Sequence, residues 1–330
     1  MGSGLQSQIG FAEETVYGTL PGSPNWRFYE LLATGLEGRK NVITSDGIRP
    51  GAAGVRLGQR RVISSRDAGG GGNRFEVANV GFGRLLKHIM GGTITSTNLA
   101  GTPAAWSHVF PLAPVEGKSL DVQIGVPRTN SATVDAYTYY GAKITDAEFA
   151  IAVDQMLTCE LSIDAQKVDR LTALATATYP SLSIFHFAQG SISVGGTAMA
   201  KVTNASWAVH RSLKADRYFI GSAGFKDEPI DNDFTTIDGR LTVEYTDPTL
   251  VHDRFWNDTP VALQLVFTGG IISGANAFKL QVDVPEIRFD GETPKVGGRD
   301  LVTQDANFNG WSDGTAAGMT MTYVTSDTAP

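Results

Sequence analysis

Hydrophobic and polar residues alternate along several stretches of the chain. In the first, Leu120, Val122 and Ile124 are separated by polar or small residues. The stretches with this period of two are residues 120–126, 149–163, 241–245, 261–267 and 278–284. Side chains of a β-strand point alternately to two faces, so the pattern predicts antiparallel strands with one buried face and one exposed face.

Two short segments have the spacing of a helix instead. Apolar residues of segment 82–90 recur at intervals of three and four, Asn79 precedes them as the expected N-cap, and two glycines follow. In segment 247–257, Asp247 is the expected N-cap and Pro248 takes the first helical position. Each helix is expected between two strands.

The order of these elements occurs twice along the chain, with an offset of about 165 residues. This repetition predicts a mainly β protein with two tandem antiparallel β-sandwich or barrel domains, each flanked by a short α-helix. One elaborated domain is the alternative. The predicted boundaries are an N-terminal arm (1–26), a first β domain (27–165) with an insertion (91–117), a linker (166–182) and a second β domain (183–330).

Composition and charge exclude several classes of protein. The 330 residues are 42% hydrophobic, and 27 basic against 34 acidic residues give a net charge of −7, which argues against a protein that wraps nucleic acid in cationic side chains. The single cysteine, Cys159, cannot form an internal disulfide and is expected in the core. The N-terminus lacks a signal-peptide pattern and no long apolar run follows, so we expect a soluble protein made in a cytoplasm.

No arrangement of residues typical of catalysis or of cofactor binding is found. Asp305, Asn307, Asn309 and Asp313 match the opening of a calcium loop, but Ala316 stands where a bidentate Glu is needed. A hydrated hairpin turn is the favoured interpretation, and ion binding there stays open. The sequence therefore predicts a protein that is not an enzyme, has no cofactor or metal, and acts through structure, binding or self-assembly.

Two long polar loops carry opposite charge. The first, residues 44–66, is basic, and the second, residues 221–236, is acidic. Their charged residues of interest are Arg49, Arg56, Arg60, Arg61 and Arg66 in the first and Asp227, Glu228, Asp231 and Asp233 in the second. Loops of opposite charge could pair between subunits, and two separately solvated loops are the alternative.

Five stretches of the chain resemble the major tail tube proteins of long-tailed, non-contractile phages of actinobacteria. They are residues 2–19 (GSGLQSQIGFAEETVYGT), 81–91 (GFGRLLKHIMG), 118–125 (KSLDVQIG), 139–145 (YYGAKIT) and 285–294 (PEIRFDGETP). The resemblance implies two packed sheets flanked by a helix, with strands of neighbouring subunits joined into one inner barrel. It also implies a virion protein, synthesised in the host bacterial cytoplasm, that stacks in rings around a tape-measure protein. Such a tube meets tail terminator and tail-tip proteins and conducts DNA, without a membrane partner.

The resemblance also suggests roles for particular residues. The two polar loops would touch the next ring, and the N-terminal arm would contact another subunit through Phe11, Val16 and Tyr17. Four acids have the strand parity opposite to the apolar residues and would face either the lumen, which is the hypothesis here, or the outside of the tube: Glu148, Glu160, Asp283 and Glu286. Two domains per chain imply rings of three chains, and a single domain implies rings of six. A phage decoration protein or adhesin is the main alternative, and a β-sandwich hydrolase with two close carboxylates is a third.

Overall fold

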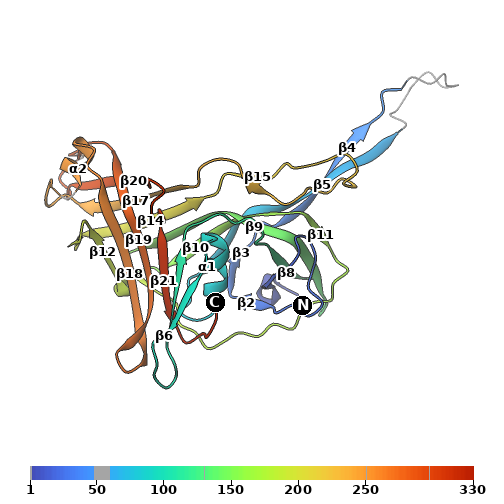
Figure 1. The fold of residues 1–330 in the computed structure, drawn as a ribbon, viewed down its shortest axis with the longest axis horizontal. Helices are drawn as coiled ribbons and strands as arrows, with labels where there is room; N and C mark the ends of the chain where they lie inside the picture. Colours follow the sequence, from blue (N-terminus) through green and yellow to red (C-terminus); the bar gives the residue numbers. More distant parts are fainter. Residues whose placement is uncertain (1, 48–59, 130, 250, 297) are drawn as a thin grey trace.

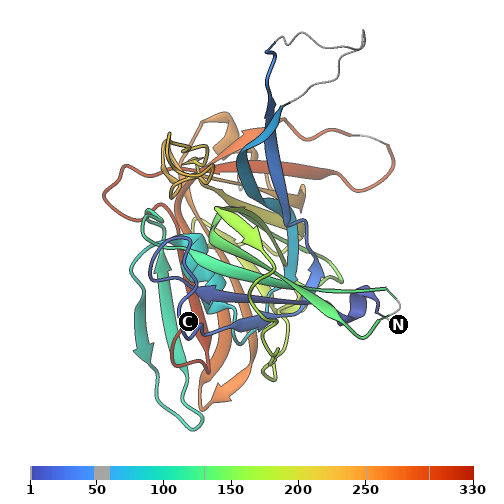
Figure 2. The same cartoon turned by 90° about the vertical axis from the view of Figure 1, so that its right-hand side faces the viewer.

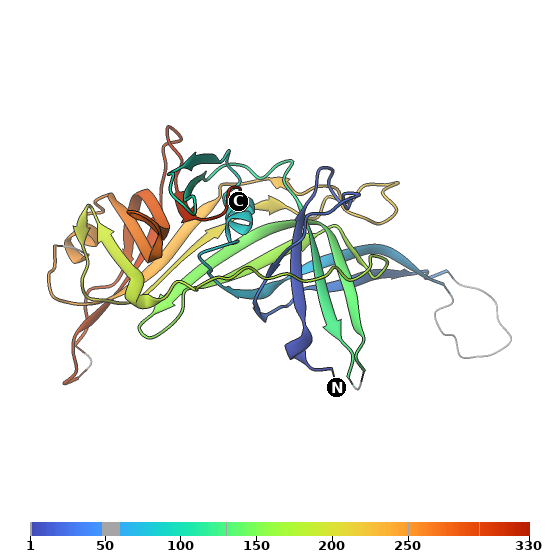
Figure 3. The ribbon, with the colours of Figure 1, turned by 90° about the horizontal axis from the view of Figure 1, so that it is seen from below.

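The computed structural model describes residues 2–47, 60–129, 131–249, 251–296 and 298–330. Antiparallel β-strands dominate these residues, and two short α-helices interrupt them. The predicted mainly β fold with two short helices is confirmed. Figure 1 and Figure 3 show an elongated body, with early strands (blue and green) at one end and late strands (orange and red) at the other.

The elements follow one another along the chain as follows. Up to residue 169 they are η1 (Gly4–Gln6), β1 (Gln8–Glu13), β2 (Arg27–Tyr29), β3 (Leu31–Ala33), β4 (Glu37–Thr44), β5 (Arg61–Glu76), α1 (Gly83–Met90), β6 (Thr95–Asn98), β7 (Trp106–Pro111), β8 (Leu120–Pro127), β9 (Val134–Ala152), β10 (Thr158–Ala165) and β11 (Lys167–Asp169). The remainder are η2 (Phe187–Gln189), β12 (Gly190–Val194), β13 (Thr197–Ala198), β14 (Val202–His210), β15 (Leu213–Lys214), β16 (Ile230–Asp231), β17 (Thr236–Glu244), α2 (His252–Trp256), β18 (Val261–Ser273), β19 (Asn276–Gly291), β20 (Thr303–Gly310) and β21 (Thr320–Thr325).

The strands of the two halves pair in the same order. In the first half, hydrogen-bonded neighbours run β1, β8, β9, β10, β5, β4. In the second half they run β12, β18, β19, β20, β17, β14. Every pair is antiparallel, so each of these six strands has a counterpart at the same place in the other half.

Strand β9 connects the two halves. Its N-terminal part pairs with β8, whereas residues 146–152 pair with β14 along the same edge. A continuous sheet therefore runs from β4 and β5 through β9 and β14 to β17 and β20.

Aromatic side chains fill the core beneath this connection. Trp207 of β14 stacks between Phe149 of β9 and Phe267 of β18, with ring centroids 5.1 and 6.2 Å away. All three are at most 2% exposed, and Cys159 of β10 is fully buried in the same core, as the sequence predicts. Burial of these large apolar groups is the main stabilising term where the halves meet.

Helix α1 is buried and is anchored at its C-terminus. Gly91 closes it with a φ of +74°, which a glycine adopts without strain. The Arg211 guanidinium donates to the Ile89 and Ala113 carbonyls at 2.6–3.1 Å, and the Lys118 ammonium donates to the Gly91 carbonyl. Cations at this end also complement the helix dipole, although burial lowers the pKa of Arg211 to about 10.

Both helices begin later than the sequence predicts. Asn79 does not cap α1, because its backbone and side chain are hydrogen-bonded to Ser183 and the helix begins at Gly83. Asp247 caps a turn by accepting the Thr249 N–H at 2.8 Å, and α2 begins only at His252.

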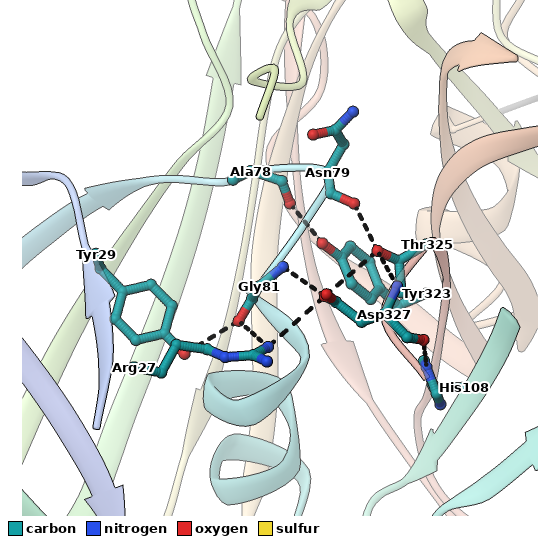
Figure 4. Close-up of polar contacts among 9 residues, drawn as sticks. All are labelled: Arg27, Tyr29, Ala78, Asn79, Gly81, His108, Tyr323, Thr325 and Asp327. Carbon is teal, nitrogen blue, oxygen red and sulfur yellow. Dashed lines mark hydrogen bonds and ion pairs between the residues drawn. The ribbon is translucent and has the colours of Figure 1, made fainter. Parts of the chain in front are cut away.

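The predicted insertion, residues 91–117, contains strands β6 and β7, and β7 pairs with β21 near the C-terminus. The residues after β21 then bind the loop before α1 (Figure 4). The Asp327 carboxylate accepts the Gly81 N–H at 2.6 Å and lies 3.6 Å from the Arg27 guanidinium. The backbone carbonyl oxygen of Asp327 lies 2.9 Å from Nε2 of the buried His108. The Tyr323 hydroxyl donates to the Ala78 carbonyl. The end of the chain thus holds the start of α1.

The predicted linker, residues 166–182, follows the sheet surface and contains β11, which pairs with β9. The side chain of Gln123 fastens it by donating to the Ala173 carbonyl at 3.0 Å and accepting the Ala175 N–H at 2.7 Å.

Candidate functional site

One face of the continuous sheet is polar and exposed. The opposite face of the sheet is apolar and packs on the core, so along each strand the residues between the core residues point outward. One row of directly opposed residues crosses seven strands of this face: Arg74, Glu160, Glu148, Ala208, Asp238, Asn309 and Arg288. All of them are polar except Ala208, which is buried. Such a wide polar face is a surface and not a pocket.

The predicted lumen acids Glu148 and Glu160 lie directly opposite each other on this face. Glu160 is 3.4 Å from the Arg74 guanidinium, and both side chains remain about half exposed. Asp283 and Glu286 are farther away on β19 and have partners of their own. Asp283 accepts hydrogen bonds from Gln264 and Gln281, and Glu286 pairs with Arg288.

His210 bridges two carboxylates at the connection between the halves. Its Nδ1 lies 2.7 Å from Asp146 of β9 and its Nε2 lies 3.0 Å from Asp238 of β17. Burial alone would lower the pKa of His210, but the hydrogen bond and the two negative charges outweigh burial and raise it. Both ring nitrogens can then donate, so a protonated His210 ties three adjacent strands together.

The calcium-like residues belong to the same face. Asp305, Asn307 and Asn309 alternate along strand β20, with Ala306 and Phe308 buried between them. The expectation of a hairpin turn at these residues is wrong, because this alternation places them in the sheet. Asp305 instead pairs with the Arg240 guanidinium and accepts the Thr242 hydroxyl at 2.8 Å.

The first polar loop is partly a hairpin formed by β4 and β5. It stands clear of the body in Figure 1 and Figure 2. Arg60 and Arg61 lie at its outer end, and Arg49 and Arg56 lie outside the described residues. The apolar side chains Ile43 and Val62, which are each 60% exposed, add an uncovered hydrophobic surface to the hairpin.

The second polar loop and Tyr218 just before it contact this hairpin within the same chain. The Arg66 N–H donates to the Gly224 carbonyl, the Tyr218 hydroxyl donates to the Arg66 carbonyl, and the Arg66 guanidinium lies over the Phe225 ring. Lys226, which is 2% exposed, lies between the carboxylates of Asp67 and Asp164. The bases of the two loops therefore meet inside one chain.

The acids of the second loop are divided in their contacts. Glu228 lies 2.6 Å from the buried Lys143 ammonium, and Asp227 lies 3.6 Å from Arg217. Asp233 accepts the N–H of the exposed Phe234, and Asp231 lies in the two-residue strand β16. Asp231 and Asp233 are thus the acids of this loop that reach solvent without a basic partner among the described side chains.

The N-terminal arm is largely part of the chain's own core. Phe11 of β1 is fully buried against Tyr29 and Phe75, and β1 pairs with β8. The expectation that Phe11 contacts another subunit therefore needs correction, because it has no surface left to offer. The hydroxyl of Tyr17 is buried as well, whereas Val16 is 64% exposed.

A comparison with protein-family models decides the identity. The family model for phage tail tube proteins matches residues 4–310, which is nearly the whole chain. The chain belongs to the phage tail tube protein family. No curated protein matches the sequence.

As a tail tube protein, the chain is a structural component of the phage tail. No helix in the described ranges is long and apolar enough to cross a membrane. Sequence reasoning missed His210 and Lys226 as connecting residues, since nothing in the local pattern marks a charge that bridges distant strands.

Proposed function

We propose that this tail tube protein assembles into stacked rings of three chains, with each chain supplying two of six equivalent β domains around a channel. The strand order carries this proposal. Six strands pair in the same order in both halves, and β9 of the first half adds β14 of the second half to its edge. The edge contact between β9 and β14 already joins two domains within one chain. If the equivalent contact also forms between neighbouring chains, the domains close into a ring.

In this proposal the polar sheet face lines the channel. Glu148 and Glu160 lie near the middle of that face, and the whole chain has a net charge of −7. A lumen with the same sign of charge as DNA would repel the phosphates and let DNA pass without binding. A tape-measure protein would occupy the channel during assembly, and tail terminator and tail-tip proteins would close the ends of the tube.

The projecting hairpin would join successive rings. Its basic end, with Arg60 and Arg61 in the described part and Arg49 and Arg56 beyond it, would meet Asp231 and Asp233 of a neighbouring ring. Exposed charge pairs of this kind set register and orientation more than affinity.

Electron microscopy of the purified protein over a range of concentrations tests the proposal. We expect hollow tubes of stacked rings, with a mass per ring of three chains. A ring mass of six chains would overturn the stoichiometry, and discrete particles without a channel at every concentration would overturn the tube.

Two variants separate the role of the hairpin from folding. Arg60→Glu with Arg61→Glu should leave rings intact but reduce stacking, whereas the matched control Arg60→Lys with Arg61→Lys keeps the charge and should stack normally. Tubes of normal length from the glutamate variant would contradict a role of these two arginines between rings.

A further inference from the structure

The contact between β9 and β14 specifies how two copies of this chain would meet. At this contact Asp146 lies opposite His210, and the two side chains form an ion pair of 2.7 Å. Because the halves share one strand order, each of these positions has a counterpart in the other half. We identify the counterparts by comparing the cross-strand partners of residues in corresponding strands of the two halves.

Cross-strand partners identify the counterpart of Asp146. Asp146 lies opposite Ser162 in β10, and Asp290 lies opposite Asn307 in β20. We align Glu160 with Asp305, because their partners on the strand before each helix, Arg74 and Thr242, lie nine and ten residues before the first residues of α1 and α2. Ser162 and Asn307 each lie two residues further along and therefore occupy matching positions. Asp290 is therefore the counterpart of Asp146.

The counterpart of His210 follows in the same way. In the second half, His210 lies opposite Thr236 of β17, and Thr236 is two residues before Asp238. In the first half, Arg39 lies opposite Asp67 of β5, and Asp67 is two residues before Gly69. Asp238 lies opposite Asn309, which is four residues beyond Asp305. Gly69 lies opposite Asp164, which is four residues beyond Glu160, the counterpart of Asp305. Asp238 and Gly69 therefore occupy matching positions. The pair Asp146–His210 thus corresponds to Asp290 and Arg39, again an anion and a cation.

Both counterpart strands have a free edge. Within the described residues β4 pairs only with β5, and all of its side chains but one are exposed. The pairing of β19 with β18 ends at Ile287, so among the residues that the structure describes the same edge of β19 has no partner strand from Arg288 to Gly291. Unpaired strand edges bind further strands through their backbone N–H and C=O groups.

We propose that the free edge of β19, residues 288–291, pairs antiparallel with β4 of a second copy of the chain, with Asp290 directly opposite Arg39. This inference rests on the ring proposed above and names its interface. Glu292 would then face Glu37, and each has a basic neighbour of its own, Lys295 and Arg39. The four side chains and Asp290 form a mixed-charge cluster across the contact.

Disulfide cross-linking tests the register. The native Cys159 is fully buried, so cysteines introduced by Asp290→Cys and Arg39→Cys are the reactive pair. Oxidation of assembled protein should give covalent dimers and closed trimers. The control pair, Asp290→Cys with Lys40→Cys, moves one thiol to the opposite face of β4 and should cross-link at least ten-fold less.

Charge reversal gives a second readout that does not depend on thiols. Arg39→Asp and Asp290→Arg should each weaken self-association about ten-fold or more. A mixture of the two variants should form dimers of one copy of each, because the carboxylate introduced at position 39 of one then faces the guanidinium introduced at position 290 of the other. Sedimentation velocity measures both effects.

The outcomes distinguish this interface from the proposed function. Tubes that form without a cross-link, or with equal cross-linking by both cysteine pairs, would overturn the register and leave the tube standing. Failure of the unmodified chain to assemble at all would count against the ring itself and would overturn both.

Discussion

Phe149 and Trp207 stack almost parallel, with 3° between their ring planes, although 58 residues of chain separate them. They are opposed residues of β9 and β14, so the stack lies at the connection between the two halves. Phe267 of β18 continues it on the side of the second half. The core beneath the connection is therefore shared.

Trp207→Ala should destabilise the whole chain. Removal of a fully buried Trp leaves a cavity that neighbouring strands cannot close, and the expected loss is about 3–5 kcal/mol of unfolding free energy. Urea denaturation measures it. Trp256→Ala is the matched control, because this Trp is 71% exposed and its loss should change stability by about 0.5 kcal/mol or less. A similar effect of the two substitutions would contradict the shared core.

Lys226→Met should release the second polar loop from the hairpin. The substitution leaves Asp67 and Asp164 without their cation, and breaking a buried ion pair costs about 3–5 kcal/mol. Limited proteolysis should cut the loop faster in the variant. Lys214→Met removes an exposed lysine of β15, a strand that precedes the same loop. This lysine pairs with the exposed Asp216, so its loss should change neither stability nor cleavage.

Glu13 on β1 links acid stability to helix α1. Its Oε1 lies 2.7 Å from the Lys87 ammonium and 3.2 Å from Nε2 of His88. Burial alone would raise the pKa of Glu13, but hydrogen bonds from His88 and Lys87 outweigh burial and lower it from 4.5 to about 2. Burial lowers the pKa of His88, so its neutral ring donates Nε2–H near pH 7.

The sign of the pH effect follows from this lowered pKa. Between pH 4.5 and 2 the unfolded chain binds a proton that the folded chain does not, so the stabilisation by Glu13 is complete above pH 4.5 and is lost as the pH falls towards 2. Glu13→Gln should therefore be less stable than the unmodified chain at pH 7, and the difference should vanish near pH 2. Urea midpoints across this range measure it, with the exposed Glu116→Gln as control. A difference that is independent of pH would contradict the assignment.

Asp327→Ala should loosen the start of α1. The substitution removes the acceptor of the Gly81 N–H and the partner of Arg27, with an expected loss of about 1–3 kcal/mol. Hydrogen exchange should quicken at Gly81 and in the first turn of α1. Asp327→Asn keeps an acceptor oxygen and should lose less. Unchanged exchange in the alanine variant would show that β21 alone holds the helix.

Alternation in the sequence predicts many of the strands, but it does not always show which faces are buried. Strand β8 follows the alternation although its residues 120–125 are all buried, so the exposed face expected there is wrong, and β20 buries alternate residues although the sequence favours a turn there. Strands β10, β18 and β19 follow the alternation, because each packs one face on the core. Strand β4 is exposed on both faces, and β1 buries four consecutive residues, Ile9 to Ala12. Neither environment produces a period of two, so the sequence predicts a loop in place of the hairpin and an arm in place of β1.

The charged residues could be found in the sequence, but their partners could not. The opposite charge of the two polar loops is visible, and it suggested pairing between subunits. The contacts of Lys226 with Asp67 and of Glu228 with Lys143 depend on strands 85 or more residues away. Such distances are set by topology and register, which a local pattern does not contain.

The pairing of β7 with β21 has a consequence for the order of synthesis. His108 and Asp327 are 219 residues apart in the chain, so β7 is translated long before its partner exists. Until then the outer strand of the first half has an open edge, and the loop before α1 lacks its fastening. Completion of the first half therefore waits until β21 and Asp327 have been translated, so this half cannot finish folding as an independent unit while the second half is still being made.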